Sequence, residues 1–191
     1  MPSAPLAARA LLAPALAAAL AAALAAPGLA SAAQLQMGAA GGISRYDDRC
    51  DGVSRCDTSD RASKAHIGLR FDSGLVLEAV WMDFGRLRGS GAGVDVALRT
   101  TAAGGGLAWY APVAPFTEFF VRAGLAQVKA RASASGFADA ESHAAVYGGL
   151  GLAWQVAPAL SVQLAWDATT LRYGDAREAV AAGTVGLSLR F

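Results

Sequence analysis

The chain has 191 residues, with 16 Lys and Arg against 15 Asp and Glu, so its net charge is close to zero. This balance excludes the basic stripe that marks nucleic-acid binding. Hydrophobic residues make up 54% of the chain, yet beyond residue 32 no apolar run is long enough to cross a membrane as a helix. Any membrane crossing by this part of the chain would therefore use strands.

The amino-terminal segment predicts export. Arg9 precedes a run of mostly Ala and Leu from Leu11 to Ala26, then Pro27 and Gly28 interrupt it, and the small residues Ala30-Ser31-Ala32 follow. A charged start, an apolar middle and a small-residue end define a signal peptide. The alternative is a retained transmembrane helix, but the run is shorter than the roughly 20 residues needed to span. We predict a signal peptide over 1–32 and one domain over 33–191.

The only two cysteines lie close together in a polar stretch. Cys50 and Cys56 flank five residues, Asp51 to Arg55. In an exported protein an even cysteine count predicts a disulfide. Closing so small a ring would stabilise the folded protein by about 2 kcal/mol in the chain-entropy description and would stiffen this loop. The alternative, a metal site, would need more Cys or His nearby, and the loop has none.

From residue 34 onward, apolar or alternating segments are separated by turn-rich polar ones. Alternation of apolar and polar side chains is typical of strands with two different faces. The phase of the fourth segment slips at Gly104-Gly105-Gly106, where we expect a bulge. The eight predicted strands cover residues 34–46, 63–71, 75–84, 94–111, 116–131, 143–156, 160–171 and 179–191.

The connections between these strands alternate in length. The second, fourth and sixth are short, whereas 47–62, 85–93, 132–142 and 172–178 are longer and more polar. Short turns at one end and long loops at the other are typical of outer-membrane barrels. Aromatic residues near strand ends suggest an aromatic girdle: Trp109, Tyr110, Trp154, Trp166 and Phe191.

The last strand separates a membrane barrel from a soluble sandwich or lipocalin-like barrel, because alternation alone fits all three. Apolar side chains recur at Val185, Leu187, Leu189 and the terminal Phe191. A chain end is usually frayed and solvated, whereas the final strand of a transmembrane barrel must pair and face lipid. We predict an all-β, eight-stranded, antiparallel up-and-down transmembrane β-barrel in the cell outer membrane.

Several segments resemble a known family. Cys56-Asp57-Thr58-Ser59-Asp60, His66-Ile67-Gly68-Leu69-Arg70-Phe71 and Leu77-Glu78-Ala79-Val80-Trp81-Met82-Asp83-Phe84-Gly85 are similar to the small eight-stranded OmpA/OmpX-like barrels (porin-family, opacity-type) of Gram-negative bacteria. The tail Gly186-Leu187-Ser188-Leu189-Arg190-Phe191 resembles the carboxyl-terminal signal read by the barrel-assembly machinery, which implies roles for Leu187, Leu189 and Phe191. The resemblance implies both termini in the periplasm and the cysteine loop outside.

The strand phases place charged residues inside the barrel. An eight-stranded barrel is just wide enough for side chains to fill it, so Glu78 and Arg122 are predicted to form a lumen charge network with Arg70 or Arg190. This predicts a structural or surface-interaction protein, with a narrow ion or small-solute channel as the alternative.

Enzyme activity is the third hypothesis. Some barrels of this size deacylate or acylate lipid A, but neither His66 nor His143 is followed by a Ser two residues later, and Ser142 would face away from His143. We therefore predict no catalytic residue, cofactor or metal. The expected partners are outer-membrane lipid and lipopolysaccharide, the assembly machinery, and a surface ligand or host protein at the loops.

Overall fold

The computed structural model describes residues 33–47, 55–91, 94–134, 137–173 and 176–191. The predicted signal peptide and Cys50 lie outside these residues, as does the side chain of Cys56, so the structure does not test the disulfide. The nine strands are β1 (Ala33–Tyr46), β2 (Arg55–Asp57), β3 (Ser59–Phe71), β4 (Leu75–Gly91), β5 (Val94–Ala114), β6 (Thr117–Ala134), β7 (Phe137–Ala157), β8 (Leu160–Tyr173) and β9 (Ala176–Arg190). No helix in the described residues has the length and apolarity to cross a membrane.

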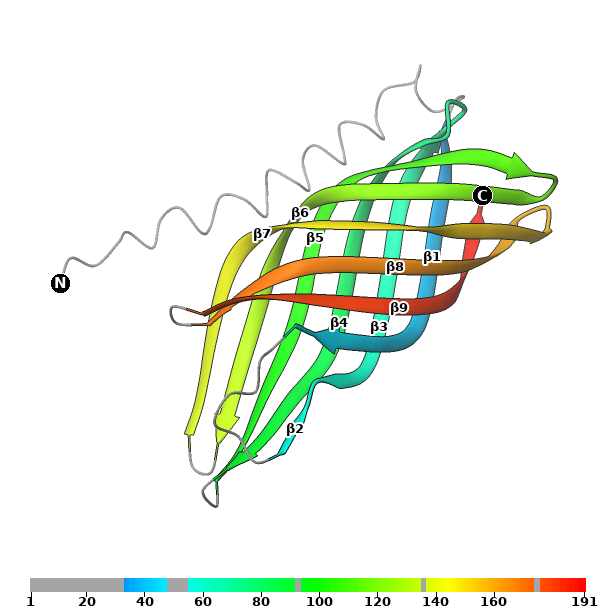
Figure 1. Cartoon of the computed structure of the whole chain (residues 1–191). Helices are drawn as coiled ribbons and strands as arrows, with labels where there is room; N and C mark the ends of the chain where they lie inside the picture. Colours follow the sequence, from blue (N-terminus) through cyan, green and yellow to red (C-terminus); the bar gives the residue numbers. More distant parts are fainter. Residues whose placement is uncertain (1–32, 48–54, 92–93, 135–136, 174–175) are drawn as a thin grey trace, which may run out of the picture. The chain divides into compact units, whose positions relative to one another are not determined.

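Eight of these strands close into an antiparallel barrel (Figure 1). Each strand pairs with its sequence neighbours, and β1 pairs with β9 from Gln36↔Arg190 to Tyr46↔Val180 to complete the ring. The short β2 lies outside the ring and pairs only with the far part of β4. The predicted fold class is confirmed.

The two ends of the barrel differ. At the turn end, short turns at 72–74, 115–116 and 158–159 join neighbouring strands. The chain terminus is fixed at this end too, because Phe191 exchanges two backbone hydrogen bonds with Leu35, of 2.9 and 3.1 Å. We call the opposite end, which holds the remaining connections, the loop end.

The predicted long loops are wrong in extent. Residues 85–91 belong to β4, 132–134 to β6 and 137–142 to β7, although their small and polar residues have low strand propensity. The reason is tertiary: once a hairpin is anchored in the barrel, its backbone groups remain hydrogen-bonded by continuing the ladder, and β5 pairs with β6 out to Val96↔Ala134. The loop end is therefore largely sheet.

The predicted bulge is also misplaced. β5 pairs with β6 without interruption through Gly104 and Gly106. The register instead shifts on β4 between Asp83 and Arg86, where Gly85 has a φ of 72°. Gly106 of β5 serves a different need, because a Cβ there would come within 2.8 Å of the Tyr147 hydroxyl. It leaves room for an aromatic ring inside the barrel.

Side chains on the outside of the closed barrel are apolar and those inside are mixed. Ile67, Leu107, Leu125 and Leu150 are exposed on the outer face. Inside, an apolar cluster containing Met82, Phe84, Tyr147 and Leu171 lies toward the loop end, and a second containing Tyr110 and Phe120 lies toward the turn end. A polar interior with an apolar exterior is typical of a barrel surrounded by lipid.

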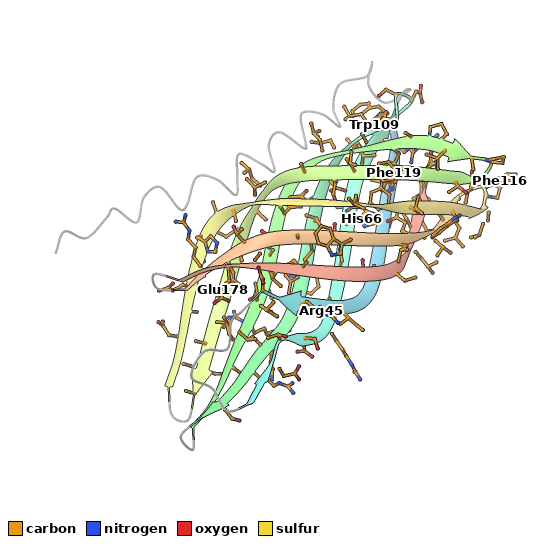
Figure 2. The ribbon with its side chains drawn as sticks, viewed as in Figure 1. Arg45, His66, Trp109, Phe116, Phe119 and Glu178 are labelled. Carbon is orange, nitrogen blue, oxygen red and sulfur yellow. The ribbon has the colours of Figure 1, made fainter. Side chains whose placement is uncertain are left out.

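Exposed aromatic side chains gather around the turn end. Figure 2 labels the exposed Trp109 and Phe116 and the half-buried Phe119 in this region, and Trp154 and Phe191 are also exposed. Two residues of the predicted girdle do not lie in it. Tyr110 is buried in the lumen, and Trp166 is exposed on the outside but in the middle of β8.

Candidate functional site

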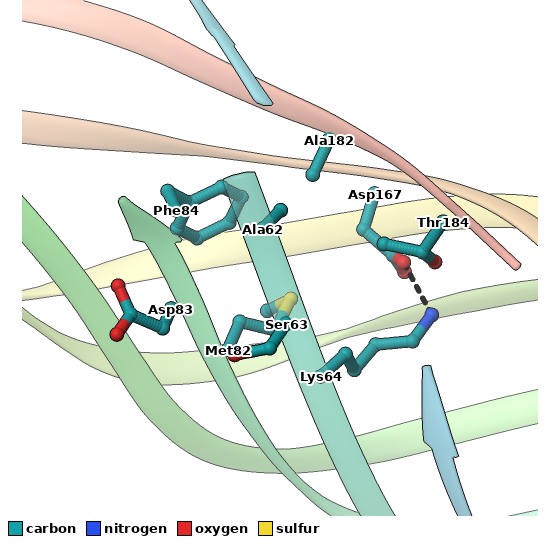
Figure 3. A pocket seen from close by; sticks show the side chains of 9 residues that line it. All are labelled: Ala62, Ser63, Lys64, Met82, Asp83, Phe84, Asp167, Ala182 and Thr184. Atoms are coloured by element: carbon teal, nitrogen blue, oxygen red, sulfur yellow. Dashed lines mark hydrogen bonds and ion pairs between the residues drawn. The ribbon is translucent and has the colours of Figure 1, made fainter. Parts of the chain in front are cut away.

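Four charged side chains meet in the middle of the lumen. The Lys64 ammonium forms an ion pair with Asp167, marked by the dashed line in Figure 3, and the two groups are 2.5 Å apart. Arg122 lies 3.6 Å from the same carboxylate and 3.4 Å from Glu78. All four are almost fully buried. Two cations and two anions balance, which is the condition under which buried charges are tolerated.

Neighbouring groups fill the remaining cross-section. The Tyr147 hydroxyl donates to Glu78 at 3.3 Å, and the Arg122 guanidinium lies over the Phe120 ring at 4.8 Å from its centroid. Between Lys64, Asp167 and the side chains of Met82 and Phe84, the remaining space is too narrow for a water molecule. This level of the lumen is packed with side chains.

A second charge cluster lies at the turn end. Glu118 accepts hydrogen bonds of 2.6 and 3.1 Å from Arg70 and lies 4.0 Å from Arg190. Between the two clusters, the buried Tyr110 hydroxyl accepts from Gln36 and Gln163 at 3.1 and 3.3 Å. From the middle of the lumen to the turn end, the central charge cluster is thus followed by a layer of Tyr and Gln side chains and then by the Glu118 cluster.

The structure separates residues that sequence reasoning grouped together. Glu78 and Arg122 share the central cluster, whereas Arg70 and Arg190 belong to the Glu118 cluster. The sequence also predicts Asp167 on the inward face, but not as a member of this network, and Lys64 and Glu118 were not singled out. Their alternation with outward apolar residues on β3, β6 and β8 was the available signal.

The two histidines have different surroundings. His66 is buried against Gly38, and neither of its ring nitrogens has a hydrogen-bond partner in the structure. His143 Nε2 lies 3.1 Å from the Thr170 carbonyl oxygen, while the neighbouring Ser142 is exposed on the other face of β7. Ser142 therefore does not lie beside the His143 ring.

Beyond the closed ring, the loop end becomes an open sheet. β4, β5, β6 and β7 extend farther than β8 and β9 (Figure 1), and β2 covers the outer edge of β4. The pairing of β7 with β8 begins at Tyr147↔Thr169, whereas its pairing with β6 continues to Phe137. Within the described chain, residues 138–140 of β7 have β6 as their only ladder partner, whereas β8 reaches the inner part of β7, where the Thr169 hydroxyl donates to the Val146 carbonyl oxygen at 3.0 Å.

The comparisons with known proteins agree with this architecture. The family described as outer membrane protein beta-barrel domain matches residues 16–191. Neisserial surface protein A has a similar structure, with 13% identity, a TM-score of 0.56, and coverage of 83% of this chain and 97% of that one. Ail, the attachment invasion locus protein of Yersinia pestis, solved in complex with the heparin analogue sucrose octasulfate, gives 14% identity, a TM-score of 0.53 and the same coverage. OprG from Pseudomonas aeruginosa gives 13% identity, a TM-score of 0.51, and coverage of 82% of this chain and 95% of that one. No curated protein matches the chain by sequence.

The fold and its filled lumen define a small transmembrane β-barrel of the cell outer membrane. The chain belongs to the family of outer-membrane proteins with a β-barrel domain. By the general rule for such barrels, the short turns face the periplasm and the loop end faces outward from the cell.

Proposed function

We propose that this barrel is a surface-interaction protein that does not conduct solutes and has no catalytic role. The observation that carries the proposal is the edge of β7 at residues 138–140, where β6 is the only ladder partner among the described residues, on a sheet that extends beyond the closed barrel. An exposed edge offers unpaired backbone donors and acceptors, to which a partner strand can add. The packed lumen argues against a pore as the alternative, since Lys64, Glu78, Arg122 and Asp167 are paired across it.

The proposed partners follow from the membrane setting. They are a protein or other surface ligand outside the cell, the lipid and lipopolysaccharide around the barrel, and the barrel-assembly machinery during biogenesis. The heparin analogue bound to Ail is a precedent for ligand binding by a barrel of similar fold. For this chain we favour a protein ligand, because the edge supplies main-chain hydrogen-bonding groups in a regular row.

The edge can be shortened and compared with an equal change elsewhere. Two eight-residue hairpin tips are suitable. In the β6–β7 hairpin, the first and last residues of segment 132–139 are the cross-strand pair Ala132↔Asp139. In the β4–β5 hairpin, those of segment 89–96 are the pair Gly89↔Val96. Each segment is replaced by an Asn-Gly turn, which suits a two-residue hairpin. Vesicles carrying each protein are applied to an array of extracellular-matrix proteins.

The expected result is that wild-type barrel binds at least one component of the array, that the β6–β7 variant loses this binding and that the β4–β5 variant keeps it. Equal binding by both variants would show that the β7 edge is not the contact. In planar bilayers, wild-type protein is expected to give no stable single-channel openings. A reproducible open state would instead support the narrow channel.

A further inference from the structure

The basic side chains of the barrel are distributed unevenly. Those inside the lumen are Lys64, Arg70, Arg122 and Arg190. Every other Lys or Arg whose side chain the structure describes lies on the outer face near the loop end: Arg45, Arg61, Arg86, Arg88, Arg99, Lys129, Arg131 and Arg172. None of the described Lys or Arg side chains lies on the outer face near the turn end.

Four of these arginines line one hollow on the outer surface. It has a volume of about 330 Å³ and lies where β3 and β4 diverge at the bulge, with Arg61, Arg86, Arg88 and Arg99 among its lining residues. We call this hollow the bulge groove. Its outward position follows from the pair Ser63↔Asp83, which stands directly after the outward pair Ala65↔Trp81.

The backbone around the bulge groove is fixed by specific contacts. From β1, Ser44 donates to the Phe84 carbonyl oxygen at 2.5 Å, and Tyr46 donates to the carbonyl oxygens of Phe84 and Gly85 at 3.2 and 3.1 Å. The Asp60 carboxylate accepts a 2.7 Å hydrogen bond from the Arg86 backbone N–H. The groove is thus a formed feature of the fold.

The charges in the bulge groove do not cancel. Asp83 accepts hydrogen bonds from Arg99 and from the Gly85 backbone N–H, and the hydrogen bond to Asp83 raises the pKa of Arg99 above its ordinary value. Among the described residues, no salt bridge engages the guanidinium groups that line the rest of the groove, those of Arg61, Arg86 and Arg88. Asp57 of β2 is the cross-strand partner of Arg88. The lining itself holds two carboxylates, Asp60 and Asp83, against four arginines, so it keeps a net positive charge.

The height of the groove indicates what faces it. Trp81, on the row below, is 45% exposed on the outer face, and it is the last outward apolar residue of β4 before the basic ones, as an aromatic girdle ends the apolar band of an outer-membrane barrel. Below Trp81 the outward residues of β4 are Ala79, Leu77 and Leu75. The groove therefore lies at the level of the lipid headgroups, next to the leaflet that faces out of the cell.

A surface that only needs to be soluble would mix charges of both signs. Here the outward charges near the loop end are mostly basic, and those of β4 begin directly beyond the bulge that follows Trp81 and Asp83. The outward leaflet of this membrane is rich in lipopolysaccharide, whose lipid A headgroup carries phosphate. Arginine recognises phosphate through paired, charge-assisted hydrogen bonds.

We infer that the bulge groove binds a phosphate group of lipid A in the outward leaflet, with Arg86 and Arg88 as its principal ligands and Arg61 beside them. Asp83 holds Arg99 at the rim of the groove. This site would anchor the barrel laterally in lipopolysaccharide. The inference rests on the outer-membrane placement of the chain, and it is independent of strand addition at β7.

The test compares lipid retention by purified full-length mature protein in native mass spectrometry. The variant R86Q/R88Q removes two charges from the groove, and R131Q/R172Q removes two exposed outward charges that do not line it. The variant R86K/R88K retains the charge. The probes are phosphorylated lipid A, dephosphorylated lipid A and inorganic pyrophosphate, and a heat-modifiable gel shift verifies that each variant is folded.

Wild-type protein is expected to retain phosphorylated lipid A and to lose most binding when the phosphates are removed. Since each basic residue near an anionic lipid surface contributes about 1 kcal/mol, R86Q/R88Q should weaken retention about tenfold or more. R86K/R88K keeps the charge but loses the paired hydrogen bonds, so it should fall between wild type and R86Q/R88Q, and R131Q/R172Q should weaken retention less than R86Q/R88Q. Wild-type retention by R86Q/R88Q, or equal binding of dephosphorylated lipid A, would overturn the inference. Pyrophosphate binding as strong as that of lipid A would show a soluble-anion site instead. Loss of array binding in the hairpin experiment would leave these results unaffected, because residues 132–139 do not line the groove.

Discussion

The closed barrel and its loop-end extension use the same strands with opposite polarity. Along the outer face of β4, Leu75, Leu77 and Trp81 are followed by Arg86 and Arg88. On the inner face the order is reversed, since the buried Glu78 is followed beyond the bulge by Leu87, which packs against the apolar cluster. One ladder therefore crosses from a lipid environment into an aqueous one, and the polarity of its side chains changes at the same point.

This comparison explains why the two regions respond differently to the same kind of substitution. In the closed barrel the outside is solvated by hydrocarbon and the inside must neutralise its own charges. In the extension the outside is solvated by water and ions. Predictions can therefore be ordered by how strongly each change violates the local environment.

The largest effect is expected from Asp167→Asn in the central cluster. The change leaves Lys64 and Arg122 with Glu78 as their only nearby carboxylate, and breaking a buried ion pair costs about 3–5 kcal/mol. The free energy of unfolding, measured by urea titration of the barrel in lipid vesicles, should fall by this amount. The control Asp57→Asn changes an exposed carboxylate at the loop end and should alter it by less than about 0.5 kcal/mol. Equal effects from the two variants would mean that the lumen cluster does not stabilise the barrel.

A smaller effect is expected from placing Arg on the outer face of β7. Leu150 is 47% exposed in the middle of the closed barrel, where Arg facing lipid costs about 2–4 kcal/mol. Ala140 lies on the same strand and the same face but in the extension, so Ala140→Arg should stay within about 0.5 kcal/mol of wild type. Both are measured as unfolding free energies in vesicles. A costly Ala140→Arg would place the membrane boundary farther toward the loop end than Trp81 indicates.

The closed barrel was more predictable from sequence than the extension. Alternation along β3, β6 and β9 is enforced by lipid outside and packing inside, so a period of two identified these strands. In the extension both faces of the sheet meet water over part of their length, and segments such as Gly85–Gly91 carry no alternation that distinguishes strand from loop. Their structure depends on partners across the ladder, which one sequence does not reveal.

The lumen was predicted in kind but incompletely in detail. Strand phase placed Glu78 and Arg122 inside, and the structure brings them within 3.4 Å. Which inward charges meet depends on the stagger between strands, and this stagger separates Arg70 and Arg190 from the central cluster. Glycine misled the bulge prediction, because Gly106 makes room for Tyr147 and a Cβ on Gly104 would meet the Leu125 carbonyl oxygen, whereas the single Gly85 has the positive φ.

The smallest stability effect is expected at the seam of the closed barrel, and it should be accompanied by a larger effect in cells. Deletion of Phe191 removes two backbone hydrogen bonds to Leu35, worth together about 1–3 kcal/mol. Phe191 is also 67% exposed on the outer face, where the proposed assembly signal formed with Leu187 and Leu189 would be read.

Phe191→Tyr keeps the ladder and the aromatic ring, and Phe191→Asp keeps the ladder alone. If the side chain is the signal, Phe191→Asp should refold in vesicles nearly as well as wild type but should reach much lower membrane levels in cells, whereas Phe191→Tyr should match wild type in both measurements. Normal membrane levels of Phe191→Asp would show instead that Phe191 only closes the β1–β9 seam. Its side chain would then matter no more for assembly than the residues at the hairpin tips of the extension.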